Sequence, residues 1–274
     1  MTIRIGRLFA GLAAIGLCAT AAQAHRQWML PSATSLSGDD VWVTVDAAIS
    51  NDLFYFEHFP MKLDNVKAWA PDGSEAKIEN AATGRYRSTF DVHLPKKGTY
   101  KIANVTTGVG GTYKVNGEEK RLPRGTTKEQ LATVIPAGAT DVKISENLSR
   151  NEIFVTVGEP TATVMTPTNV GLELVPLTHP TDLVVGEQAR FRFLADGKPA
   201  SNVEVLVIPG GVRYRDQLND RRLKTDANGE VGIDWREPGM YWINATVGGG
   251  REEGDVPAAP RRMSYITTVE VNAP

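Results

Sequence analysis

Histidine is the residue type in this chain that indicates the most specific chemistry, because imidazole nitrogen binds nickel, copper, zinc and iron ions. The 274 residues contain only four histidines: His25, His58, His93 and His179. His25 directly follows Ala22-Gln23-Ala24, which fits the A-x-A pattern at which a secretory leader is cut. Cleavage there makes His25 the first residue, whose α-amine and imidazole Nδ1 can together chelate one metal ion.

The loop at residues 51–60 offers further ligands, since it combines two acids and a histidine with three phenylalanines and a tyrosine. Two interpretations of this loop stay open. Its aromatic rings could cap one end of a β-sandwich, or the loop could carry a binding site, as exposed loops often do.

We hypothesise a histidine brace, in which His25 supplies two nitrogens and His58 supplies the third. His93 is an alternative third ligand, and Glu57 or Asp52 is an alternative oxygen ligand. The metal would be nickel, cobalt, copper or iron. The competing interpretations are a loose chain terminus at His25 and histidines that serve only the fold.

The first 24 residues predict a cleaved signal peptide. Arg4 and Arg7 precede the uncharged, apolar residues 8–22, and this run is shorter than the roughly 20 residues that a membrane-spanning helix needs. We therefore expect a periplasmic protein that does not span a membrane after cleavage. Cys18 is the only cysteine, so the mature chain can form no disulfide and no thiolate metal site.

Composition excludes several classes of function. The formal net charge is −2, and losing Arg4 and Arg7 makes it −4, which argues against a nucleic-acid partner. The chain has no nucleophile elbow, HExxH motif, Cys–His pair or phosphate loop, so we expect a binding protein rather than an enzyme. The basic cluster between Arg213 and Lys224 is interpreted as a solvated loop, and His179 as a structural turn residue.

Strand-like alternation between turn signals predicts an all-β fold. Residues 41–46, 66–70 and 85–94 read as strands, and so do residues 188–194, which alternate with Ala189, Phe191 and Phe193 on one face. Asn116-Gly117 predicts a tight hairpin turn. Only residues 127–134 suggest a helix. A Pro-x-x-Gly-Thr-Tyr hairpin ending at Tyr100 is typical of immunoglobulin-like sandwiches.

The second half of the chain repeats this pattern. A second Pro-Gly-x-Tyr hairpin ends at Tyr241. The order of turns and strands over residues 196–241 resembles a carboxypeptidase-regulatory-like, or transthyretin-like, sandwich. We therefore predict a signal peptide (1–24), an N-terminal sandwich (25–158), a linker (159–167) and a C-terminal sandwich (168–274).

The mature chain as a whole resembles the DUF4198 family of bacterial periplasmic proteins, once grouped with nickel-uptake components. The resemblance rests on His25 with Trp28 and Pro31, and on residues 57–60, 70–73, 171–176, 179–183 and 196–199. It implies an accessory role in nickel, cobalt or iron acquisition, alongside a membrane transport component. Where the family pattern has an acid after the terminal histidine, this chain has Arg26. Two other function classes stay open: a copper carrier or oxidative enzyme that uses the same brace, and a metal-free partner-binding module.

Overall fold

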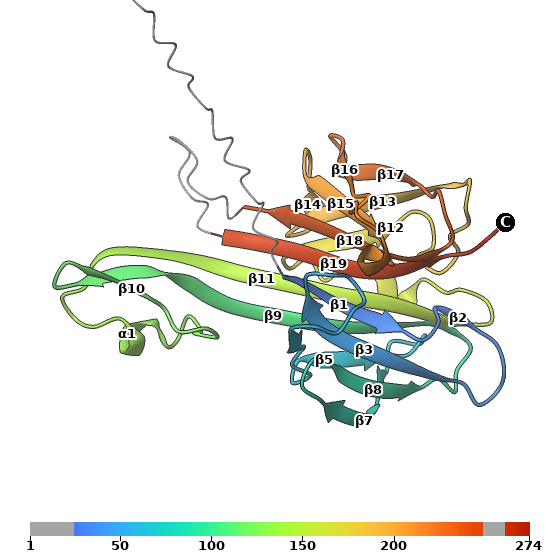
Figure 1. The fold of residues 1–274 in the computed structure, drawn as a ribbon, viewed down its shortest axis with the longest axis horizontal. Coiled ribbons are helices and arrows are strands. Elements are labelled where there is room, and N and C mark those ends of the chain that lie inside the picture. Colours follow the sequence, from blue (N-terminus) through green and yellow to red (C-terminus); the bar gives the residue numbers. More distant parts are fainter. Residues whose placement is uncertain (1–24, 249–260) are drawn as a thin grey trace, which may run out of the picture.

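The computed structural model describes residues 25–248 and 261–274, and these form two β-sandwiches with very little helix (Figure 1). The predicted all-β fold is therefore confirmed. The predicted signal peptide, residues 1–24, lies outside the described residues. Within those residues, no helix is long and apolar enough to cross a membrane.

The first sandwich packs two sheets around one core. One sheet has the strand order β1-β3-β8-β7, with the short β4 paired to β3. Its strands are β1 (Arg26–Pro31), β3 (Trp42–Ser50), β4 (Phe59–Pro60), β7 (Ile78–Thr83) and β8 (Ser88–His93). The facing sheet contains β2 (Ser35–Leu36), β5 (Val66–Trp69), β6 (Glu75–Ala76), β9 (Gly98–Val115) and β11 (Thr140–Val157). Alternate residues of both sheets, including Val45, Phe90, Tyr100 and Ile153, fill the core between them.

The second sandwich has the same two-layer plan. One sheet contains β12 (Leu172–Pro176), β13 (Gln188–Ala195), β14 (Lys198–Pro199) and β17 (Glu230–Asp234). The other contains β15 (Glu204–Pro209), β16 (Arg221–Lys224), β18 (Gly239–Val247) and β19 (Arg261–Val271). Phe191 and Phe193 of the predicted alternating run are buried in its core.

A shared sheet joins the two sandwiches. Strand β19 pairs in parallel with β11, from Glu146 opposite Arg261 to Glu152 opposite Thr267, which produces a ten-stranded sheet running through both (Figure 1). At this seam the buried Tyr265 hydroxyl donates a hydrogen bond to Glu152 Oε2 at 3.1 Å. Burial and the neighbouring Glu152 carboxylate raise the pKa of Tyr265 well above its ordinary value.

The far ends of β9 and β11 leave the sandwich as an arm that also carries β10 (Glu118–Arg121) and α1 (Leu131–Val134) (Figure 1). The predicted turn at Asn116-Gly117 is confirmed, since both residues have positive φ angles, 53° and 84°. The helix begins four residues later than the sequence predicts. Gln130 holds its N-cap position and makes no side-chain capping bond.

The two tyrosine hairpins have matching geometry. The Tyr100 hydroxyl accepts a hydrogen bond from the Lys96 N–H at 2.8 Å and donates one to the Lys96 carbonyl at 3.0 Å. The Tyr241 hydroxyl makes the same pair with Glu237, at 3.3 and 2.8 Å. Each tyrosine thus ties the start of its strand to the preceding turn, and the repeat seen in the sequence is a structural repeat.

Candidate metal centre

Strand pairing brings His25 and His58 together. Strand β1 begins at Arg26, which lies opposite Ser50 at the end of β3. The chain then loops out and returns to β3 as β4, with Phe59 opposite Ile49. His25 and His58 therefore both lie one residue outside strands that flank the same end of β3. Their ring centroids are 4.5 Å apart, with the ring planes at 60°.

The loop that carries His58 is held by its own acid. Glu57 Oε1 accepts hydrogen bonds from the backbone N–H groups of Asn51 and Asp52, both at 2.8 Å. The Arg26 guanidinium donates to the Asn51 carbonyl at 2.6 Å. Glu57 therefore supports the loop through Oε1, the oxygen that accepts both backbone donors.

His58 has a ring nitrogen available. Its Nε2 lies 3.3 Å from the Asn51 side-chain nitrogen, whereas its Nδ1 is buried and has no hydrogen-bond partner. The nearest acid is Glu57, whose Oε1 lies 3.4 Å from Nδ1. A buried polar atom that makes no hydrogen bond is uncommon in folded proteins, and here the only polar contact is the one with Glu57. An imidazole in this state suits a metal ligand.

The second sandwich packs against the strands that carry the histidine pair. A junction cluster, defined as Trp28, Ala48, Leu53, Ile208, Trp242 and Ile266, is buried between the two sandwiches. The Trp242 Nε1–H donates to the Gln27 carbonyl at 2.9 Å. The His25–His58 pair therefore lies beside the contact between the sandwiches.

Backbone strain also marks the loop. Phe54 has a φ angle of +62°, a conformation that costs a bulky residue about 1–3 kcal/mol and persists only where packing enforces it. Its ring packs edge-on against Trp28 at 5.5 Å between ring centroids. Added side-chain bulk at Gly210 would meet the Phe54 ring at 3.1 Å. The second sandwich therefore helps to hold the strained loop.

The basic cluster of residues 213–224 is more ordered than predicted. The Arg213 guanidinium lies 3.8 Å from the Tyr55 ring centroid, and Arg215 donates to four backbone carbonyls, including that of Pro209 at 2.6 Å. Arg213 is exposed, as the solvated-loop interpretation expects, whereas Arg215 is half-buried and fixed by these bonds. Burial lowers the pKa of Arg26, and the carboxylates of Asp220 and Asp52 oppose that shift. Asp52 thus lies near the site as a charge partner of Arg26.

The structure does not bring His93 to the site. His93 pairs with Trp42 at the opposite end of β3, eight residues from Ser50, which is about 27 Å along a strand. Its Nε2 lies 2.7 Å from Asp40 Oδ1, and its ring stacks on Trp42 at 4.5 Å. His93 cannot replace His58 as the third ligand of a brace at His25.

His179 is a structural residue, as predicted. Its Nε2 lies 3.1 Å from Thr99 Oγ1, and its Nδ1 lies 3.0 Å from Thr181 Oγ1. Burial lowers the pKa of this histidine. The side chain links the first sandwich to the start of the second.

Sequence reasoning missed two neighbours of the histidine pair, Asn51 and Phe59. The Phe59 ring lies 6.1 Å from His25 and 6.3 Å from His58 between ring centroids. Both residues belong to the 51–60 loop that carries His58, and membership of this loop was the available signal. In residues 25–248 and 261–274, no group of three His, Cys, Asp or Glu side chains is arranged to hold a metal ion.

These features define a two-sandwich, all-β protein with a histidine pair beside the junction of the sandwiches. The chain belongs to the DUF4198 family, described as a domain of unknown function, whose model matches residues 22–249. The match covers the first sandwich and the second as far as β18, and it confirms the family resemblance. No curated protein matches the chain.

Solved structures offer only distant likenesses. The D0-D1 domain of intimin is 15% identical, with 89% of this chain and 96% of that chain covered and a TM-score of 0.22. Trypsin-activated alpha-2-macroglobulin from Escherichia coli is 12% identical, with 89% and 16% covered and a TM-score of 0.22. Scores this low carry no argument about function or architecture.

Proposed function

We propose that the protein is a periplasmic accessory protein that binds a transition-metal ion through His25 and His58. The ion would be nickel, cobalt or iron, and the role would be uptake or homeostasis. The observation that supports this most is the 4.5 Å contact between the two imidazole rings. Residues far apart in the chain, at positions 25 and 58, meet at one end of β3, and the Nδ1 of His58 makes no hydrogen bond.

The third ligand would be the main chain itself. Side chains of the described ranges form no group of three or more acids, histidines or cysteines for a metal. A two-histidine site therefore needs another donor, and the α-amine of His25 is the nearest candidate once the leader is removed. Because that amine exists only after cleavage behind Ala24, the precursor would lack the complete site.

The predicted leader supports the periplasmic location, and the family resemblance supports a partner in the inner- or outer-membrane metal transport system. The net charge of −2 gives no support to a nucleic-acid partner. An organism would gain from delayed assembly of the site, since metal capture would then begin only after export.

A copper brace with oxidative activity is a second candidate, favoured by Phe59. This ring is 57% exposed and lies against both histidines. An exposed aromatic ring beside a metal could contact a substrate. Copper-dependent oxidation by the mature protein would favour this candidate over carriage.

The test is a metal titration of mature protein that truly begins at His25. Nickel, cobalt, iron, copper and zinc are titrated by calorimetry, in parallel with a version that carries one extra glycine before His25. The extension converts the amine to an amide, and removing this ligand should weaken binding about 100-fold or more. Equal binding by both versions would eliminate the brace. Absence of binding by either would favour a metal-free, partner-binding module.

A further inference from the structure

A cavity of about 500 Å³ lies on the outer face of the first sandwich, away from the histidine pair. Strand alternation explains its lining. Val66 and Ala68 of β5 point into the core, so Lys67 and Trp69 point outward. The neighbouring β9 sends Lys101, Ala103 and Val105 to the same face, and all of these line the cavity.

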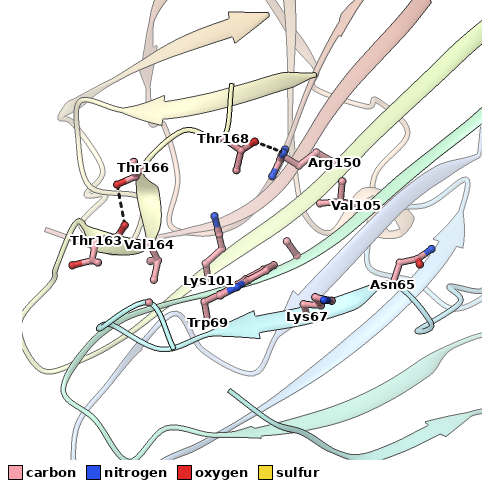
Figure 2. A pocket seen from close by; sticks show the side chains of 12 residues that line it. Asn65, Lys67, Trp69, Lys101, Val105, Arg150, Thr163, Val164, Thr166 and Thr168 are labelled. Atoms are coloured by element: carbon pink, nitrogen blue, oxygen red, sulfur yellow. Dashed lines mark hydrogen bonds between the residues drawn. The ribbon is translucent and has the colours of Figure 1, made fainter. Parts of the chain in front are cut away.

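The segment that links the two sandwiches forms the opposite wall. The 3-10 helix η1 (Thr163–Met165) buries Val164 and Met165 against Phe154, with Trp69 at the edge of this small cluster. Figure 2 shows Thr163, Val164 and Thr166 across the cavity from Trp69 and Lys101. The volume falls in the range of small-molecule sites, about 300–1,000 Å³.

The cationic side chains that line the cavity differ in whether a carboxylate already pairs with them. Arg150 is already used: its guanidinium lies 2.9 Å from Glu152 Oε1 and 3.4 Å from Glu173 Oε1. By contrast, no carboxylate in the described parts of the chain lies within ion-pair distance of Lys67 or Lys101. The acid that pairs with Trp69 across β6 is Glu75, and it makes no ion pair with either lysine.

The two lysines are placed to act on one ligand. Trp69 lies opposite Lys101, and Lys67 lies opposite Ala103, so the lysines are diagonal neighbours on one face, about 7–8 Å apart at the backbone. The Lys101 ammonium lies 5.2 Å from the Trp69 ring centroid. The Lys101 ammonium therefore stands beside an indole ring, and Lys67 lines the same cavity, with no ion pair to either lysine among the described residues.

We propose that this cavity binds a small organic anion with a flat apolar body. The anionic group would take the ammonium donors of Lys67 and Lys101, which are strong donors because they are charged. The body would lie along Trp69, Val105 and Val164, and the threonine hydroxyls would contact its far end. The site shares no residue with the candidate metal centre and stands independently of it.

Two matched fluorescent probes test the proposal on the whole mature protein: 8-anilinonaphthalene-1-sulfonate, and N-phenyl-1-naphthylamine, which lacks the sulfonate. We expect saturable binding of the sulfonate with one-to-one stoichiometry, and weaker binding of the neutral probe. Replacing both lysines, K67Q with K101Q, should weaken sulfonate binding about tenfold or more and leave the neutral probe unchanged. Adding sodium sulfate should displace the sulfonate probe no more than sodium chloride of equal ionic strength does.

The control removes the same charge elsewhere. Lys62 and Lys198 are exposed and lie outside the cavity, so K62Q with K198Q should bind the sulfonate probe as the wild type does. Circular dichroism and the melting temperature establish that each variant is folded. The proposal is overturned by no binding, by equal binding of both probes, by equal losses in the two double variants, or by specific displacement with sulfate.

Discussion

The two ends of strand β3 each carry a histidine, and their surroundings differ sharply. At one end, His58 lies against His25 with a buried nitrogen that has no hydrogen-bond partner. At the other, His93 is hydrogen bonded to Asp40, an acid that is 84% exposed, and stacks on the exposed Trp42. Residue type and neighbouring acid are alike at the two ends, so they do not distinguish a ligand from a surface residue.

The difference comes from what covers the outer face of the sheet. Near Ala48 the second sandwich packs onto this face and buries the junction cluster. Near Trp42 nothing in the described ranges covers it, and this ring is 42% exposed. The buried cluster fixes the strands and loop that carry the histidine pair, although the His58 side chain is 28% exposed against 36% for His93. A fixed support lets a ligand set be organised in advance. The predictions below compare the two ends.

The largest expected effect is on the free energy of unfolding, and it concerns the tryptophan near each end of β3. Trp28 is fully buried, and its Nε1–H donates to Ser50 Oγ at 2.8 Å. W28A should lower the free energy of unfolding by about 3–5 kcal/mol, because it leaves a cavity and removes the donor to Ser50 Oγ, which keeps its own bond to the Asp52 carbonyl. W42A should cost about 1 kcal/mol, since only a partly exposed stack is lost. Urea unfolding of both variants measures the two values, and similar losses would mean that the ends are equally buried.

The next effect is on metal affinity. H58A should weaken binding of the preferred metal by mature protein about 10–100-fold, because one of three nitrogen ligands is removed. H93A is the matched control and should leave the affinity unchanged, since His93 lies at the far end of β3. Calorimetric titration of both variants provides the measurement. A comparable loss in H93A would contradict the placement of the site.

The smallest expected effect is on the pH dependence of stability, and it concerns His179, which lies at neither end of β3. Burial lowers the pKa of its imidazole from the ordinary 6.5, so the unfolded chain binds a proton that the folded chain does not. Stability should therefore be complete above pH 6.5 and decline as the pH falls below it, until the lowered folded pKa is reached. H179Q cannot titrate and should show a flatter decline over this window.

Denaturant unfolding at several pH values between about 5 and 8 measures this slope. H93Q is the reference variant, because it removes a histidine that is one-third exposed and paired on the surface. An unchanged slope in H179Q would show that this ring does not contribute to the pH dependence.

Local sequence predicted much of the fold because its signals act over a few residues. Alternation in residues 188–194 predicted β13 and its buried face, and Asn116-Gly117 predicted a hairpin whose turn needs positive φ angles. The tyrosine hairpins were predicted for the same reason, since the hydroxyl bonds a residue four positions earlier. The helix at 127–134 was overpredicted: only its last four residues are helical, and none of them is buried.

The pairing of strands that are far apart in the sequence could not be predicted from such local signals. Alternation tells which face of a strand is buried and does not tell which strand lies at its edge, so the parallel pairing of β19 with β11 was not predicted. The same limit applied to the basic loop, whose Arg213 finds its partner Tyr55 in the other sandwich. It also applied to the cavity at Trp69, whose walls come from β5, β9, β11 and the linking segment.

The sequence by itself determined the all-β class, the DUF4198 family and a short set of candidate ligands, because composition, alternation and motif spacing are properties of the linear chain. Only the tertiary structure decided that His58 meets His25 and that His93 does not. That choice depends on the register of β1, β4 and β8 along β3. Register is set by the packing of whole sheets, and it is this packing that separates two similar histidines by the length of a strand.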